Sequence, residues 1–245
     1  MKEEPNVKKI LPIITALLLI TTLSQAQENV TLEIFHKTFP NMKAERIAKS
    51  EIAGLYEVQA GNNIFYFDPT TGYLLFGDIL TRDGKNLSAE KREDLLSRRV
   101  QEIPLEKGVK IGSGKNVVVE FTDPDCPFCR KTAEWFEKTR ADVTRYVFFY
   151  PIARLHPKAE AKAKYILAAR DKGKAYREVM KGALDNADMK TLEASDKSGV
   201  LLEEHRRLAL KAGVFATPTL WVNGKHVAGA NIPLIEKYLK GEKQP

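Results

Sequence analysis

Cysteine is almost absent from this sequence. Only two of the 245 residues are cysteines, Cys126 and Cys129, and they lie three positions apart. A disulfide stabilises a fold mainly by closing a long loop, and a pair this close closes almost none. The spacing argues against a stabilising disulfide framework, so we expect the pair to act through its reactivity or through a bound metal.

Long apolar runs are equally scarce. One run covers residues 10–23, which is shorter than the roughly 20 residues that a spanning helix needs. Lys8 and Lys9 precede it, and Ser24 and Ala26 place small residues where a signal peptidase cuts. Residues 1–26 are therefore predicted to be a signal peptide for export, and an uncleaved anchor is the alternative.

The sequence has no block of one charge. Its formal net charge is +7, but the basic residues are interspersed with acidic ones. It contains no internal repeat, no low-complexity tract and no motif of a nucleic-acid-binding module. We predict a solvated basic surface and no nucleic-acid partner.

Metal ligands in a usable pattern are also missing. A structural zinc site takes four ligands, and no second cysteine pair follows the first. The four histidines are scattered in sequence and are predicted to be surface or capping residues: His36, His156, His205 and His226. We therefore predict no metal and no cofactor.

Residues 27–84 predict a small α+β domain. The patterns favour a helix over residues 44–50 and strands over residues 55–60, 64–67 and 73–77. About 55 residues bury little apolar surface, so pairing with a second copy would stabilise this domain. Residues 85–104 follow as a polar linker helix capped by Ser88, and a surface helix within one continuous domain is the alternative.

Residues 105–245 show an α/β order. Apolar strands are predicted at residues 117–121 and 143–150, as a parallel pair joined by a helix over residues 127–140. Asn223 and Gly224 predict a type I′ turn between strands at residues 219–222 and 225–228. The remaining helices are predicted at residues 158–171, 174–184, 201–212 and 233–239.

The chemistry is expected at the start of the helix over residues 127–140. Cys126 precedes the helix and Pro127 occupies its first position, where a missing N–H costs nothing. Free N–H groups and the helix dipole stabilise a thiolate there, so Cys126 is predicted to be an exposed, ionised nucleophile. Cys129 lies one turn later, towards the core, and is predicted to resolve the mixed disulfide that Cys126 forms.

The segment over residues 120–131, with Cys126-Pro127-Phe128-Cys129, resembles the active site of thioredoxin-fold proteins. Within that fold the chain is similar to the bacterial periplasmic disulfide isomerases of the DsbC/DsbG type, over nearly its whole length. The resemblance implies a thioredoxin-like catalytic domain over residues 105–245 with a helical insertion at about residues 152–213. It also implies a dimerisation domain over residues 27–84, a linker helix, a V-shaped homodimer and a periplasmic location.

Three more site residues come from this resemblance. Thr217 and Pro218 resemble the loop in which the fold keeps a cis-proline facing the cysteines, where backbone groups bind substrate. A trans proline at an edge strand is the alternative. Glu120 matches a buried acid that relays the proton of the inner cysteine in many oxidoreductases of this fold, whereas a solvated acid at the strand edge is the alternative.

The function expected from these residues is thiol–disulfide exchange. The leading hypothesis is a disulfide isomerase that acts on misfolded or misoxidised exported proteins and is kept reduced by a membrane thiol reductant of the DsbD kind. Two features depart from the isomerases: a buried acid such as Glu120 is more usual in thioredoxins and DsbA-type oxidases, and the extra structural disulfide of some isomerases is missing. The alternatives are a DsbA-like oxidase, a dedicated reductase and a holdase chaperone with little redox activity.

Overall fold

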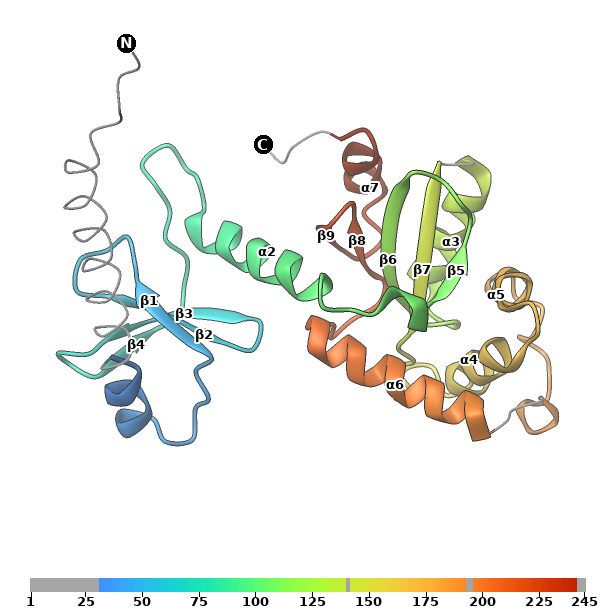
Figure 1. The fold of residues 1–245 in the computed structure, drawn as a ribbon, viewed down its shortest axis with the longest axis horizontal. Coiled ribbons are helices and arrows are strands. Elements are labelled where there is room, and N and C mark those ends of the chain that lie inside the picture. Colours follow the sequence, from blue (N-terminus) through green and yellow to red (C-terminus); the bar gives the residue numbers. More distant parts are fainter. Residues whose placement is uncertain (1–30, 140–141, 193–195, 242–245) are drawn as a thin grey trace, which may run out of the picture. The chain divides into compact units, whose positions relative to one another are not determined.

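The computed structural model describes residues 31–139, 142–192 and 196–241 (Figure 1). The predicted signal peptide at residues 1–26 lies outside them. The chain forms two compact units that divide between Arg92 and Glu93. Among the described residues, no helix has both the length and the apolar character that crossing a bilayer requires.

The first unit is a helix over residues 31–38 followed by an antiparallel meander. Its strands are β1 (Arg46–Lys49), β2 (Tyr56–Ala60), β3 (Asn63–Asp68) and β4 (Tyr73–Leu75). One face is closed by a core of buried apolar side chains: Phe35, Ile47, Val58, Phe65 and Phe67.

The prediction of a helix over residues 44–50 is wrong. These residues contain β1, in which Ile47 is 3% exposed and pairs with Val58 of β2. The segment offers only one strongly apolar side chain to the core, and an edge strand can bury one residue while its neighbours stay in solvent. Cross-strand pairing therefore outweighs the local helix preference of residues 44–50.

Helix α2 (Leu87–Val100) spans the division between the two units. Ser88 does not cap it, because Asn86 accepts the Ala89 N–H at 2.8 Å instead. The Ser88 hydroxyl is buried, where it bonds Tyr66 and accepts the Ile79 N–H at 2.8 Å. The expected capping role of Ser88 is thus wrong, because its hydroxyl is already held by the first unit.

The second unit is built on a five-stranded sheet in the order β5-β7-β6-β8-β9. Its strands are β5 (Val109–Ile111), β6 (Asn116–Thr122), β7 (Val143–Phe149), β8 (Thr219–Val222) and β9 (Lys225–Ala228). β6 and β7 are parallel, as predicted, and every other pairing is antiparallel. β5 was not predicted, since three residues are too short to show a pattern.

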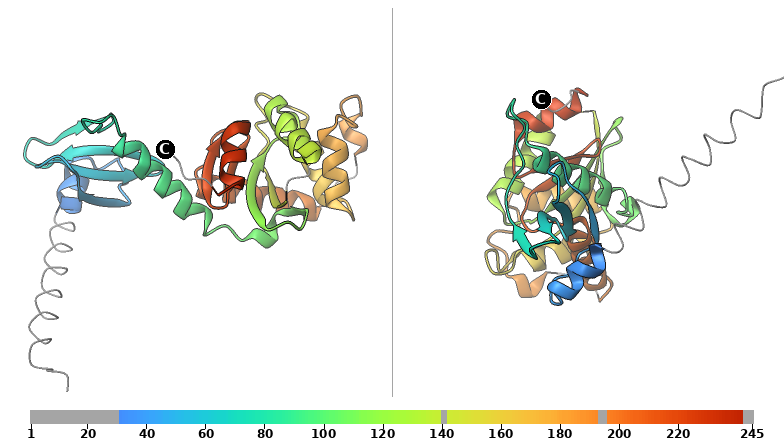
Figure 2. Two further views of the ribbon diagram at one scale, coloured as in Figure 1. Left: turned by 90° about the horizontal axis from the view of Figure 1, so that it is seen from above. Right: turned by 90° about the vertical axis from the view of Figure 1, so that its left-hand side faces the viewer.

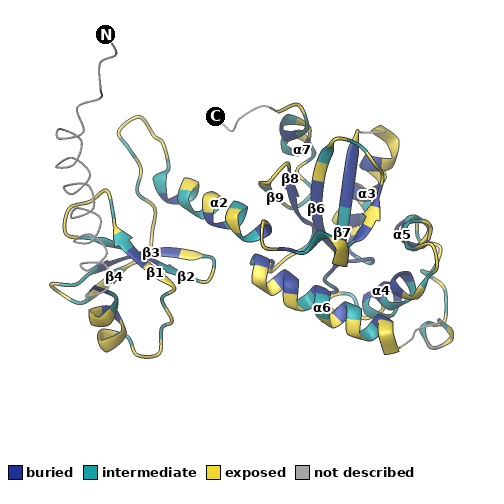
Figure 3. Ribbon diagram, viewed as in Figure 1, coloured by how far each residue is buried: buried dark blue, intermediate teal, exposed yellow. Residues whose placement is uncertain are grey.

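Helices cover both faces of this sheet. They are α3 (Pro127–Thr139), α4 (Ala159–Ala168), α5 (Lys172–Met180), α6 (Asp196–Ala212) and α7 (Ile232–Leu239). Helices α3 and α7 pack on one face, and α6 packs on the other with the end of α2 (Figures 1 and 2). Strands β6 and β7 between them are almost wholly buried, whereas the edge strand β9 is largely exposed (Figure 3).

Two local predictions are confirmed. Asn223 and Gly224 have φ values of 50° and 80°, the positive angles that a type I′ turn needs. The helical insertion, α4 to α6 with a 3-10 turn at Met189–Thr191, separates β7 from β8. The sheet and its helices therefore have the mixed α+β architecture that the resemblance implied.

Candidate active site

Cys126 caps the N-terminus of α3. Its N–H donates to Asp123 O at 3.1 Å, and its carbonyl accepts the Arg130 N–H, also at 3.1 Å. Pro127 is the first residue of the helix. The chain therefore turns sharply between β6 and α3, and the Cys126 sulfur meets the free N–H groups of the first helical turn.

The two thiols are unbonded and differ strongly in acidity. A hydrogen bond from Cys129 is the main cause that lowers the pKa of Cys126 to about 6, and the backbone N–H groups of Cys129 and Phe128 add to it. Burial raises the pKa of Cys129, and the neighbouring Cys126 raises it further. At neutral pH the pair can therefore hold one thiolate, on Cys126, beside one thiol.

Cys126 is less exposed than expected. Cys126 is 5% exposed, so the prediction that it is an exposed nucleophile is wrong. Cys129 is fully buried. The loop before β8 is one cause, because the Cys126 thiol donates to Thr217 O at 3.5 Å. The peptide bond between Thr217 and Pro218 is cis, so the trans alternative is excluded.

Glu120 lies in the middle of β6 and is fully buried, which excludes the solvated alternative. Its Oε2 accepts Arg145 Nη2 at 2.6 Å, and Arg145, from β7, is only 2% exposed. The Glu120 Oε1 atom has no hydrogen-bond partner among the described residues. One oxygen of this buried carboxylate is thus ion-paired, and the other is free to accept a hydrogen bond.

Arg145 and Tyr176 were missed by the sequence reasoning. Arg145 donates to the Tyr176 hydroxyl at 2.7 Å, and its guanidinium lies 4.4 Å from the centre of the Phe136 ring. Burial is the main cause that raises the pKa of Tyr176; the Arg145 charge opposes it, and the Glu120 charge raises the pKa further. A signal for Arg145 did exist, because Glu120 and Arg145 are each an isolated charge in adjacent apolar strands.

Asp123 anchors the turn that carries the nucleophile. The residue is fully buried, and its N–H donates to Cys129 Sγ at 3.4 Å. Its carboxylate accepts the N–H groups of Asp125 and Ile152, at 2.9 and 2.7 Å, and lies 3.0 Å from His156 Nδ1. The turn is therefore held by hydrogen bonds within itself, to Cys129 and to the segment that follows β7.

His205 was predicted to be a surface or capping residue, and the surface position is wrong. It is fully buried in α6, where Nδ1 accepts the Phe149 N–H at 3.0 Å and Nε2 lies 2.8 Å from Lys107 O. Burial lowers the pKa of His205 to about 4. The ring is a neutral brace between β7 and the segment that precedes β5, because both of its nitrogens satisfy backbone groups.

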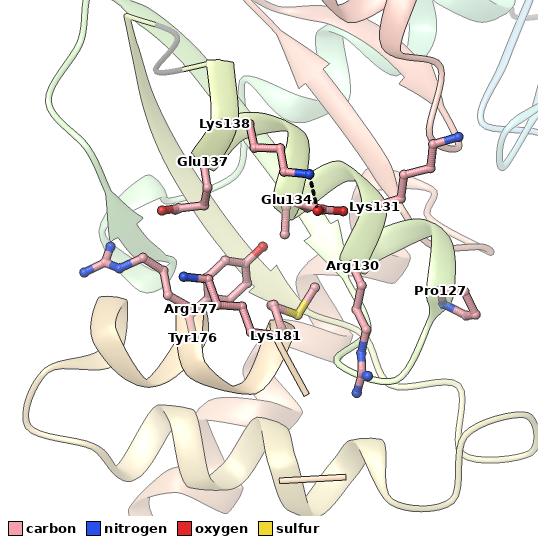
Figure 4. Close-up of a pocket in the computed structure, with 11 residues that line it drawn as sticks. Pro127, Arg130, Lys131, Glu134, Glu137, Lys138, Tyr176, Arg177 and Lys181 are labelled. Carbon is pink, nitrogen blue, oxygen red and sulfur yellow. Dashed lines mark ion pairs between the residues drawn. The ribbon is translucent and has the colours of Figure 1, made fainter. Parts of the chain in front are cut away.

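A groove of about 890 Å³ runs between α3 and α5 (Figure 4). Pro127 lies at one end, next to Cys126, and the buried side chains of Ala133, Tyr176 and Met180 contribute to its lining. Glu134 and Lys138 form an ion pair at 2.5 Å along α3. In Figure 4 the guanidinium of Arg130 points away from this ion pair.

A parallel β-α-β unit, a hairpin, a Cys-x-x-Cys pair at a helix start and a facing cis-proline together define a thioredoxin-fold protein with a dithiol site. The thioredoxin-like domain model matches residues 107–239, more than half of the chain. The chain belongs to the thioredoxin-like family. Residues 22–89 also match the model of the disulfide bond isomerase protein N-terminal domain.

Curated relatives match both parts. The chain is 33% identical over 162 residues to the "Probable thiol:disulfide interchange protein DsbC" of Bordetella avium, a match that covers 63% of this chain but only 56% of that protein. It is 25% identical over 251 residues to the "Thiol:disulfide interchange protein DsbC" of Escherichia coli K12, covering 97% of each.

A solved structure supports the fold alone. The thiol-disulfide exchange protein alpha-DsbA2 from Wolbachia pipientis superposes with a TM-score of 0.51 at 16% identity. The superposition covers 62% of this chain and 97% of that one. At this identity the likeness extends to the thioredoxin-like architecture and not to the reaction.

Proposed function

We propose that this chain is a disulfide isomerase that rearranges incorrect disulfides in exported proteins. The observation that carries the proposal is the placement of Cys126 at the N-terminus of α3 with Cys129 buried one turn later, which makes Cys126 the more acidic thiol. Such a pair supplies a thiolate at neutral pH and holds a second thiol in reserve. The match of residues 22–89 to an isomerase N-terminal domain favours isomerisation over simple oxidation.

The reaction begins when the Cys126 thiolate attacks one sulfur of a substrate disulfide. That bond breaks, a mixed disulfide forms, and the other substrate sulfur leaves as a thiolate. The freed thiolate attacks a different disulfide of the same substrate. A later substrate thiolate attacks the mixed disulfide and releases Cys126 as a thiolate, so the cycle has no net gain or loss of electrons.

Cys129 resolves mixed disulfides that persist. Its sulfur attacks Cys126 Sγ, the substrate leaves reduced, and a disulfide forms between Cys126 and Cys129. The thiol must lose its proton, and Glu120 Oε1 is the acceptor that we assign, since it is buried and has no hydrogen-bond partner among the described residues. A membrane thiol reductant of the DsbD kind then returns two electrons in the periplasm.

Substrate binds beside the cis peptide bond between Thr217 and Pro218, where backbone groups pair with an extended strand. Three large apolar side chains are exposed on the first turn of α3, on the segment after β7 and on the loop before β8: Phe128, Leu155 and Phe215. Phe128 is two residues from Cys126, and Phe215 is two residues from Thr217. Exposed apolar side chains of this kind suit the exposed core segments of misfolded polypeptides.

We further propose that the chain forms a homodimer through its first unit. β4 lies at the edge of the four-stranded sheet, with unpaired backbone groups available to a second copy. Large apolar side chains on and just after β4 are exposed: Tyr73, Leu75, Phe76 and Leu80. Burying this surface would add to the small apolar core of this domain.

The deciding experiment is the unscrambling of a misoxidised protein that contains several disulfides. Cys126→Ser should abolish the activity, whereas Cys129→Ala should keep part of it, because isomerisation needs one attacking thiol. Complete loss with Cys129→Ala would replace the proposal by a cycle of reduction and reoxidation. If Cys126→Ser still suppresses aggregation as well as the wild type, the chaperone activity is independent of the thiols.

A further inference from the structure

Asp125 immediately precedes the nucleophile. A carboxylate next to a thiolate disfavours the anion, because like charges repel. Left alone, the Asp125 carboxylate would disfavour the Cys126 thiolate, so the groups that face this carboxylate bear on the nucleophile.

Two cations compensate the charge of Asp125. Arg130, on α3, places Nη2 at 3.0 Å from Asp125 Oδ1. Lys162, on α4 of the helical insertion, places Nζ at 2.5 Å from the same oxygen. The Lys162 side chain is only 1% exposed, and a lysine is seldom buried without carboxylate partners.

Asp185 completes the cluster from the segment after α5. It accepts both terminal nitrogens of Arg130, at 2.6 and 2.7 Å, and Lys162 Nζ at 2.6 Å. Hydrogen bonds from Arg130 and then Lys162 hold the pKa of Asp185 well below its usual range. Two cations and two carboxylates thus cancel within one cluster.

The cluster also holds the backbone of the turn. Arg130 Nε donates to Pro124 O at 2.8 Å, two residues before Cys126. Because Arg130 is itself fixed by Asp185, the insertion and the turn are joined through one guanidinium. Removing a member would change both the local charge and the hold on the turn.

We propose that Lys162 is a positioning residue that neutralises Asp125 and thereby sets how readily the Cys126 thiol ionises. The proposal rests on Cys126 being the attacking thiol of the proposed function. The helical insertion supplies both Lys162 and Asp185, and Lys162 balances the second carboxylate, because Arg130 faces both Asp125 and Asp185. Removing the Lys162 charge leaves the cluster with a net charge of −1 beside the nucleophile.

Other charged or titratable groups around the turn stay in place in the test. They are Cys129, Asp123 with His156, Lys131 on α3, and Lys158, whose Nζ donates to Asp185 O at 3.1 Å. The cis-proline loop over residues 213–218 has no titratable side chain. A change at Lys162 therefore acts through Asp125, Arg130 and Asp185.

The test measures the pKa of Cys126 in the full chain from the pH dependence of its alkylation, with the labelled site read by mass spectrometry. Lys162→Met should raise this pKa by about one unit, the shift expected from one uncompensated nearby charge. Adding Asp125→Asn to Lys162→Met should return the pKa to within about 0.3 unit of the wild type, because the cluster is neutral again.

Lys164→Met is the matched control. Lys164 lies on the same helix, and its one ion-pair partner among the described residues is Glu160, at 2.6 Å, so its loss should leave the Cys126 pKa unchanged. If Lys162→Met does not fold, the pKa of Cys126 in the Asp125→Asn variant alone still tests the proposal. It leaves a net charge of +1 and should lower the Cys126 pKa.

An unchanged pKa in Lys162→Met, or a double variant that stays as high as the single one, overturns the proposal. A rise of the pKa in Asp125→Asn alone overturns it as well. These outcomes are independent of the unscrambling assay. A chain that unscrambles nothing but shows the predicted shifts contradicts the proposed function alone.

Discussion

Glu120 and Arg145 form a 2.6 Å ion pair that solvent hardly reaches, on the two central strands of the sheet. Each residue interrupts an apolar strand, and each supplies the charge that the other needs. Breaking a buried pair costs more than replacing both partners, because a single remaining charge is left without compensation.

Arg145→Met should therefore lower the free energy of unfolding by about 3–5 kcal/mol, as a broken buried pair does. Glu120→Leu with Arg145→Met should lower it much less than Arg145→Met alone. Urea unfolding of the reduced proteins measures both values. Equal losses in the single and double variants would contradict a dependence of Glu120 on Arg145.

Glu120→Gln tests the proton relay. If Glu120 Oε1 receives the Cys129 proton, the variant should slow release of a mixed disulfide by about a hundredfold, the lower end of general-base contributions. To measure this step, a mixed disulfide between a substrate and Cys126 is formed, and the reaction is stopped with acid at successive times to give the rate of substrate release. Alkylation of Cys126 at pH 7 is the control and should change little. Release at the wild-type rate would remove Glu120 from the mechanism.

The acidity of Cys126 predicts its reactivity profile. Since its pKa is lowered to about 6, alkylation should rise with pH, reach half its maximum near pH 6 and level off by pH 7. Cys129 should stay unlabelled, because burial raises its pKa. In urea the midpoint should move to about 8.5, the value of a free thiol. A folded midpoint near 8.5 would contradict the assigned nucleophile.

His205 predicts a loss of stability in acid. Its folded pKa, lowered to about 4, lies below that of an unfolded histidine, so the unfolded chain binds a proton first. Stability should be complete above pH 6.5 and fall as the pH drops towards 4, by at most about 3 kcal/mol from this group. Urea unfolding at pH 7, 5.5 and 4.5 measures the decline. His205→Gln should be less stable at pH 7 and show a shallower decline, and an equally steep one would contradict the assignment.

The edge strand β4 predicts the site of dimerisation. Phe76 is 72% exposed, and its ring centre lies 5.1 Å from that of Phe65, so Phe76→Glu should disturb the core of the first unit little but should break a dimer that buries this side chain. Light scattering gives the mass in solution. Val200→Glu is the matched control, since Val200 is 71% exposed on α6 of the other unit. A Phe76→Glu protein with the wild-type mass would exclude this edge.

The sequence by itself determined the features that depend only on neighbouring residues. Pro127 after Cys126 set the start of α3, and the pair Asn223 and Gly224 set the hairpin turn. The alternating and continuous apolar runs predicted most of the strands and helices of the second unit. Each of these follows from the conformations of a few neighbouring residues, which the sequence contains in full.

Only the tertiary structure decided which residues far apart in the sequence contact one another. Asp125 meets Lys162 across 37 positions, and Glu120 meets Arg145 across 25. The burial of His205 and the strand at residues 46–49 have the same cause. Both depend on contacts with groups that are far away in the chain. Spacing in the sequence records which side chains are available, but only folding brings them within a few ångströms, where charge and burial act.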